Sequence, residues 1–201
     1  MKNILLVGGL LLATGAAHAQ NNVVKVDIIR PTVNTGAFSF EHKLSESASF
    51  QLTLSYTANY KEEGSSFFGG NYQGRSTSGF GIMPEYRFYL SEKYAALQGF
   101  YVAPFVRYQY LSQTGGFSRN PYFPGGNGRY EASLNAFGGG LLVGRHWIFK
   151  RRFSLDVNLG PEYVAASVSG NGPELNQGDF LGFNNFTNYN LNGAATFGFA
   201  F

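Results

Sequence analysis

The segment FQLTLSYTANY, residues 50 to 60, alternates between apolar and polar side chains over its whole length. Its apolar positions carry Phe, Leu, Tyr or Ala, and its polar positions carry Gln, Thr, Ser or Asn. A period of two predicts a β-strand with one apolar and one polar face. Two kinds of barrel use such strands. A soluble barrel turns the apolar face inward, and a transmembrane barrel turns it toward lipid.

The composition favours the transmembrane kind. The 201 residues include 17% aromatic residues, 27 glycines and only 13% charged residues, whereas about 25% charged residues is typical of soluble domains. The formal net charge of +3 is small, so we expect no nucleic-acid partner. Cysteine is absent, which excludes disulfides and an anchor on a lipid-modified cysteine.

The first nineteen residues have the features of a secretory signal peptide. Lys2 supplies a positive start, ILLVGGLLLATGA supplies a short apolar core, and Ala17-His18-Ala19 fits a cleavage site before Gln20. We therefore expect residues 1–19 to be a signal peptide and residues 20–201 to form one outer-membrane β-barrel domain.

Seven further segments alternate in the same way, so the sequence predicts eight strands. The predicted strands are residues 23–30, 37–44, 50–60, 79–90, 100–110, 130–148, 153–165 and 189–201. Long loops alternate with short connections along the chain, and the long loops are expected at residues 61–76, 112–128 and 169–186. Only the hairpin around residues 34–36 departs from this order. Most segments reach the roughly 9 to 11 residues that cross a bilayer at a tilt.

These features predict an all-β fold, an eight-stranded antiparallel up-and-down transmembrane β-barrel in the outer membrane of a Gram-negative bacterium. An even number of strands leaves both termini on the periplasmic side. The final alternating run ends at Phe201, which we interpret as the signal read by the outer-membrane assembly machinery.

Two neighbouring stretches carry a family resemblance. MPEYRFYL, residues 83–90, and YVAPFVRYQY, residues 101–110, resemble the small outer-membrane β-barrels of Bacteroidota, including the family called domain of unknown function 3575. FSFEHKLS, residues 38–45, resembles the opening strand of that family. The resemblance covers most of residues 24–201. It implies an eight-stranded barrel related in architecture to OmpX and OmpA, and it implies no catalytic residue.

The polar face of the strands is predicted to enclose a charged lumen. Its charged residues are Lys25, Asp27, Glu41, Lys43, Glu85, Arg87, Arg107, Glu131, Arg145, Asp156 and Glu162. An eight-stranded barrel is just wide enough for side chains, and buried charges require partners. We therefore expect a network of internal salt bridges, and the alternative is a narrow polar pathway for small solutes.

The long loops hold aromatic residues among Gly and Asn. These are Phe67, Phe68, Tyr72, Phe117, Tyr122, Phe123, Phe180, Phe183 and Phe186. Either they pack among themselves and at the membrane interface, or they form a docking surface for a protein, a glycan or lipopolysaccharide. Arg75, Arg119 and Arg129 near the rim could meet lipopolysaccharide phosphates.

The sequence offers little for catalysis. Alternation places His42 and His146 on the lipid-facing side, away from a nucleophile. The GGGLLVG segment, residues 138–144, lacks the Lys-Ser/Thr of a phosphate-binding loop, and no cluster has the spacing of metal ligands. We therefore expect no cofactor, no metal and no enzymatic activity. A non-catalytic barrel with a structural or binding role is favoured over a low-conductance channel, and a lipid A-modifying enzyme comes third.

Three prolines sit on the predicted outward face, at positions 84, 104 and 161. Proline cannot donate a hydrogen bond to the ladder and is usually found at edges or bulges. A closed barrel has no edge, so the sequence predicts local bulges at these three positions.

Overall fold

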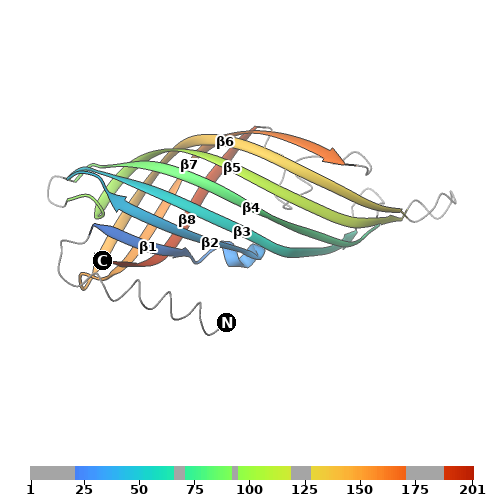
Figure 1. Ribbon diagram of the computed structural model, residues 1–201, viewed down its shortest axis with the longest axis horizontal. Helices are drawn as coiled ribbons and strands as arrows, with labels where there is room; N and C mark the ends of the chain where they lie inside the picture. The colour runs from blue at the N-terminus through green and yellow to red at the C-terminus, as the bar shows by residue number, and fades with distance from the viewer. Residues whose placement is uncertain (1–20, 66–70, 92–94, 119–127, 171–187) are drawn as a thin grey trace.

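The computed structural model describes residues 21–65, 71–91, 95–118, 128–170 and 188–201. Eight strands in this part of the chain form one closed antiparallel barrel, in which each strand pairs with the next and β1 pairs with β8 (Figure 1). The elements are β1 (Asn22–Asp27), η1 (Arg30–Val33), β2 (Thr35–Lys43), β3 (Ala48–Ser65), β4 (Asn71–Tyr89), β5 (Gly99–Ser118), β6 (Gly128–Phe149), β7 (Phe153–Gly170) and β8 (Tyr189–Ala200). The predicted fold class is confirmed.

The expected signal peptide, residues 1–19, lies outside the described residues. Among the residues that are described, no helix has both the length and the apolar character needed to cross a membrane.

The apolar residues of the strands point out of the barrel. On β7, Phe153, Val157, Leu159 and Tyr163 are all exposed, with Leu159 at 54%. The residues between them alternate into the interior and are buried. A soluble protein has the opposite arrangement. The fold is therefore that of a barrel whose outer surface matches lipid.

The outward apolar residues form a band of limited height. On β7 the band runs from Phe153 to Tyr163, and the exposed outward residues beyond it are the small Ala165, Ser167 and Ser169. On β6 the band includes Phe137, Leu141 and Val143. The eleven residues from Phe153 to Tyr163 match the roughly 9 to 11 that a tilted strand needs to cross a bilayer. We call these residues the apolar band.

The predicted faces of β6 are wrong. Glu131, Ser133, Asn135 and Arg145 were expected inside, yet Glu131, Asn135 and Arg145 are exposed and Ser133 is half-buried. The buried residues of this strand are instead Tyr130, Ala132, Leu134, Ala136, Gly138, Leu142, Gly144 and His146. Glu131 and Asn135 lie beyond the apolar band, whereas Arg145 lies between the apolar residues Val143 and Trp147 on the outer face. Because β6 is about twice as long as a tilted strand needs to cross a bilayer, its outer face is polar at the end far from the short turn, and this misled the prediction.

Two of the predicted long loops are shorter than expected. β3 extends to Ser65, β4 begins at Asn71, β5 extends to Ser118 and β6 begins at Gly128. Tyr72 and Phe117, predicted in loops, pair with each other in the β4–β5 ladder. The other predicted loop aromatics, Phe67, Phe68, Tyr122, Phe123, Phe180, Phe183 and Phe186, lie outside the described residues. Beyond the apolar band, buried residues such as Leu111, Ala132 and Leu134 are apolar, and outward residues such as Glu131 and Asn135 are exposed and polar. The pattern that identifies a transmembrane strand is therefore lost there.

The prediction of bulges at the prolines is also wrong. Pro84 pairs with Leu52, Pro104 with Leu141 and Pro161 with Leu191, and the register is the same on both sides of each pair. The described register shifts lie elsewhere, in the upper parts of β3 and β4. The barrel therefore accommodates each proline by losing a ladder hydrogen bond on one side, without an inserted residue.

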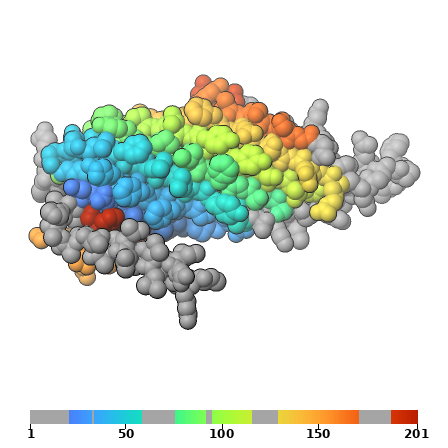
Figure 2. Space-filling view, viewed as in Figure 1, coloured from blue at the N-terminus to red at the C-terminus, as the bar shows by residue number. Residues whose placement is uncertain are grey.

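The two ends of the barrel differ. One end, which we call the short-turn end, holds the turn at residues 150–152 and the meeting of Asn22 with Phe201, whose backbones exchange two hydrogen bonds. In Figure 1 the strands are strongly tilted, and β4, β5 and β6 extend far past η1 toward the opposite end. Side chains of β2 to β6 cover the face of the barrel shown in Figure 2 as a continuous surface.

A segment of the β4–β5 connection covers the interior at the short-turn end. Leu97 is only 1% exposed and packs with Val23 and Ala200. The backbone N–H of Ala96 donates to the carbonyl of Glu46, at 2.7 Å. Leu97 has a φ of 81°, which costs energy in a residue other than glycine. The strain is compensated by the burial of its side chain.

The apolar band can be tested with a charge placed on it. We expect Leu159→Arg, in the middle of the band, to lower the folding free energy in phospholipid vesicles by about 2–4 kcal/mol, because the guanidinium would enter hydrocarbon. Ser167→Arg, on the same strand above the band, should cost less than about 1 kcal/mol. Denaturant titration of both variants measures this, and equal costs would contradict the position of the band.

Candidate functional site

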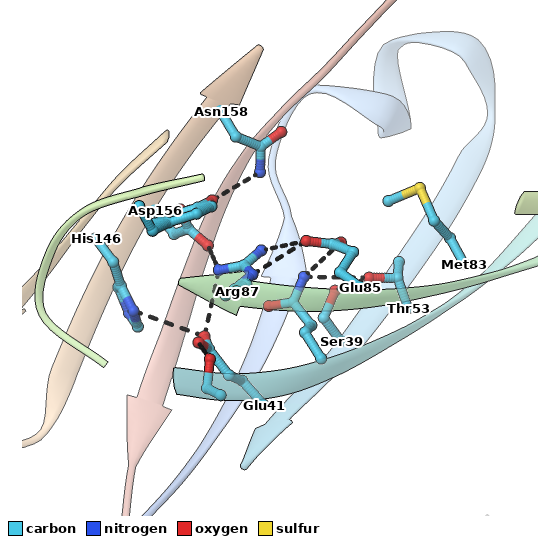
Figure 3. A network of polar contacts seen from close by, with 12 residues as sticks. Ser39, Glu41, Thr53, Met83, Glu85, Arg87, His146, Asp156 and Asn158 are labelled. Carbon is cyan, nitrogen blue, oxygen red and sulfur yellow. Dashed lines mark hydrogen bonds and ion pairs between the residues drawn. The ribbon is translucent and has the colours of Figure 1, made fainter. Parts of the chain in front are cut away.

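Five buried charged residues from four strands meet inside the barrel near the short-turn end. They are Lys25 of β1, Glu41 of β2, Glu85 and Arg87 of β4, and Asp156 of β7, and each is at most 1% exposed. Each lies at an inward position of the two-residue alternation. We call these five residues the charge network, and Figure 3 labels four of them, Glu41, Glu85, Arg87 and Asp156.

Arg87 lies at the centre of the charge network. Its Nη2 and Nε donate to Oε2 of Glu85 at 2.8 and 3.0 Å. Its Nη1 donates to Oδ2 of Asp156 at 2.6 Å and to Oε2 of Glu41 at 3.3 Å. The guanidinium also stacks on the ring of Tyr101, 4.4 Å from the ring centre. The planar, multidentate guanidinium thus joins three carboxylates at once, which a lysine could not do with the same geometry.

Lys25 shares two of those carboxylates. Its Nζ donates to Oε2 of Glu41 and, at 2.8 Å, to Oδ2 of Asp156. A third bond reaches Oε1 of Gln51 at 2.9 Å. The ammonium group therefore uses all three of its hydrogen-bond donors.

Neutral side chains donate to the remaining carboxylate oxygens. Tyr89 and Ser49 donate to Oε1 of Glu41. Tyr101 donates to Oδ1 of Asp156 at 2.7 Å, and Gln51 to Oε1 of Glu85 at 2.9 Å. Every carboxylate oxygen of the charge network therefore accepts at least one hydrogen bond, as burial of charge requires.

The ring of Tyr101 reaches Asp156 because β6 has a glycine beneath it. A Cβ at Gly144 would lie 2.5 Å from the Tyr101 ring. The absence of a side chain at Gly144 therefore makes room for the large neighbouring ring of Tyr101.

His146 is the main correction at the site. It was expected on the lipid-facing side, but its side chain is fully buried in the lumen. Its Nδ1 lies 3.2 Å from the hydroxyl of Tyr89 and 3.6 Å from Oε2 of Glu41. The error follows from the inverted faces of β6. By contrast, His42 is exposed and its Nδ1 lies 2.7 Å from Oδ1 of Asn22.

Glu41, His146 and Asp156 also have the geometry of a possible metal site. One ligand atom from each lies within 4.8 Å of the others. However, Lys25 and Arg87 already donate to Oε2 of Glu41 and Oδ2 of Asp156. A metal ion would have to displace two side-chain cations, so the donor set fits internal ion pairing better.

A second group of charges lies farther from the short-turn end. Arg107 donates through Nε and Nη2 to the two oxygens of Glu162, at 2.6 and 3.0 Å. Asp27 accepts hydrogen bonds from the backbone N–H groups of Ile29 and Arg30 and forms an ion pair with the Arg30 side chain at 3.3 Å. These pairs are partly accessible, since the Arg107 and Arg30 side chains are 23% and 21% exposed.

The eleven residues predicted to share one network therefore separate into groups. Lys25, Glu41, Glu85, Arg87 and Asp156 form the charge network, while Asp27, Arg107 and Glu162 belong to the second group. Lys43 lies at the rim and pairs with the exposed Glu46. Glu131 and Arg145 are outside the barrel.

Sequence reasoning missed the neutral donors and His146. Alternation puts Tyr89 on the inward face with Glu85 and Arg87, but neither Tyr89 nor Tyr101 was recognised as a hydrogen-bond donor to the buried carboxylates. A usable signal existed on β6, where Phe137, Trp147 and Phe149 share one face with Arg145. The other strands turn Phe outward, and the same rule would have placed His146 inside.

Comparison with known proteins assigns the family. The family model described as "Protein of unknown function (DUF3575)" matches residues 5–180, and the chain belongs to this family. No curated protein matches the sequence.

Two solved structures are similar in fold. A major outer membrane protein from Thermus thermophilus aligns with a TM-score of 0.52 and 15% identity, over 92% of this chain and 100% of that one. CarO from Acinetobacter baumannii aligns with a TM-score of 0.47 and 12% identity, over 92% and 98% of the two chains. At this identity the first likeness supports the barrel fold, and neither assigns a specific function.

Removal of Arg87 tests the energetic role of the charge network. We expect Arg87→Gln to destabilise the barrel by about 3–5 kcal/mol, because Lys25 alone would remain to balance three buried carboxylates. Lys43→Gln is the control, since it breaks an ion pair with an exposed partner and should cost less than about 1 kcal/mol. Urea titration in detergent micelles, followed by far-ultraviolet circular dichroism, measures both, and similar losses would contradict this account.

Proposed function

We propose that this chain is a sealed, non-conducting outer-membrane barrel with a structural or binding role. The observation that carries the proposal is the charge network, which crosses the lumen from β1 and β2 to β4 and β7 with side chains that are at most 1% exposed. Each of its groups is held by several partners. A mobile ion entering the lumen would have to break these bonds.

Packing on both sides of the charge network supports a seal. Toward the short-turn end, Leu97 covers the interior with Val23 and Ala200. Along the lumen, Met83, Tyr101, Phe105 and Leu142 form a buried apolar cluster. An eight-stranded barrel has little interior space, so side chains of this size favour a plug over a pore.

We also propose that the barrel lies in the outer membrane and has no catalytic activity. The outward apolar band and the fold likeness to outer-membrane proteins support the location. The position of His146 supports the absence of catalysis. It contacts Glu41 and Tyr89 inside the barrel at the short-turn end, where a lipid substrate has no access.

The export and binding parts of the proposal rest on the sequence. We expect from the sequence that residues 1–19 are removed and that the assembly machinery recognises Phe201. We also expect a Bacteroidota origin and an OmpX-like character. At the end of the barrel opposite the short-turn end, we expect contacts with lipopolysaccharide, protein or glycan. The length of β3 to β6, 18 to 22 residues, supports a docking role, because these strands raise the loops well above the band.

Planar-bilayer recording tests the sealed barrel. We expect the wild-type protein to show no steady openings, and a double variant, Arg87→Ala with Leu97→Gly, to leak ions because two side chains that fill the lumen are shortened. A heat-dependent gel shift confirms that the double variant is folded. Steady wild-type openings that disappear in Glu85→Gln or Arg107→Gln would instead establish the low-conductance channel.

A further inference from the structure

Arg145 is a charged residue on the outer, otherwise apolar wall of the barrel. On β6 it lies between Val143 and Trp147 on the same face, and its Cα partners are Phe100 of β5 and Val157 of β7. The residue is exposed. Its guanidinium is therefore surrounded by apolar and aromatic side chains on a surface that faces lipid.

Two aromatic rings hold the guanidinium in place. The central carbon of Arg145 lies 4.7 Å from the ring centre of Phe100 and 5.0 Å from that of Trp147. Stacking of this kind orients the planar group and leaves the N–H donors at its edge available. The guanidinium of Arg145 is thus preorganised for an anion that approaches from outside the barrel.

The described part of the chain supplies no anion for this guanidinium. None of the ion pairs among the described residues includes Arg145. The buried cations Lys25 and Arg87, in contrast, each contact two or more carboxylates. A lipid-facing arginine is costly unless it lies near the headgroups, so an external partner is expected.

The position of Arg145 identifies the membrane region. Its partner Phe100 is the second residue of β5, and Arg145 lies four residues before Phe149, the last residue of β6. Arg145 therefore lies in the part of the apolar band nearest the short-turn end. The nearby turn contributes three exposed cations, Lys150, Arg151 and Arg152. Basic residues at this level attract anionic headgroups.

We propose that Arg145, held between Phe100 and Trp147, binds the phosphate of a phospholipid headgroup in the leaflet at the short-turn end. The guanidinium donates two parallel hydrogen bonds to the phosphate oxygens. The acyl chains then run along Val143 and Val157 in the apolar band. This inference rests on the proposed insertion of the barrel into a bilayer and goes beyond it by naming a lipid site.

Trp147 makes the site directly observable, because it is the single tryptophan of the chain. The full mature protein in neutral detergent micelles is titrated with phosphatidylglycerol that carries bromine on its acyl chains, and the quenching of Trp147 fluorescence is recorded. Diacylglycerol with the same brominated chains is the matched lipid that lacks phosphate. Lys43→Gln, which removes a rim cation that is already paired with Glu46, is the control variant.

We expect saturable quenching of the wild type and of Lys43→Gln at the same mole fraction of phosphatidylglycerol. Arg145→Gln should need about a tenfold higher mole fraction of phosphatidylglycerol for the same quenching. This factor corresponds to about 1.4 kcal/mol, the loss of one charge-assisted contact. Diacylglycerol should quench the wild type and Arg145→Gln equally. Equal curves for wild type and Arg145→Gln with phosphatidylglycerol would overturn the phosphate site while leaving the barrel in lipid. Absence of quenching by both lipids would overturn the membrane insertion as well.

Discussion

The apolar band is the constraint on which the rest of the structure depends. Its Phe, Leu, Val and Tyr side chains are exposed on the outside of a closed sheet, and burial of this surface requires acyl chains in place of water. The two-residue alternation then places the polar residues inside. A narrow interior filled with charged residues is stable only when every charge is paired, so the outward band leads directly to the internal charge network.

The charge network also constrains the register of the strands in the barrel. A buried ion pair contributes little net stability compared with apolar packing, but breaking it is costly. The network joins β1, β2, β4 and β7, which are not all neighbours in the sheet. A one-residue slip of a strand would turn its charged residue toward lipid. We infer that Arg87 and Lys25 help to select a single register during assembly.

Much of the fold could be predicted from the sequence because lipid and lumen impose opposite demands on successive residues. All eight strands and the inward positions of Lys25, Glu41, Glu85, Arg87 and Asp156 follow from alternation alone. The prediction failed in two places. Beyond the apolar band the ends of β4 and β5, NYQGRSTS and SQTGGFS, show no regular apolar alternation, and Tyr72 and Phe117 were placed in loops. On β6 the run Leu141-Leu142-Val143 obscures the alternation, and His146 was placed outside.

The partners of the charges could not be predicted from the same pattern. Alternation shows which face a residue occupies, but not which strand lies opposite across the lumen. The meeting of Arg87 with Asp156, for example, depends on the curvature and tilt of the closed barrel. The role of Tyr101 likewise depends on the absence of a side chain at Gly144, on a neighbouring strand.

The central claim is that one face of each strand contacts acyl chains and the other is enclosed. Because the chain has no cysteine, single cysteines at positions 141, 142 and 143 on β6 and at 157, 158 and 159 on β7 can carry a nitroxide label in vesicles. We expect high accessibility to oxygen, which concentrates in the hydrocarbon, at Leu141, Val143, Val157 and Leu159, and low accessibility at Leu142 and Asn158. Equal or higher accessibility at Leu142 and Asn158 would contradict the account.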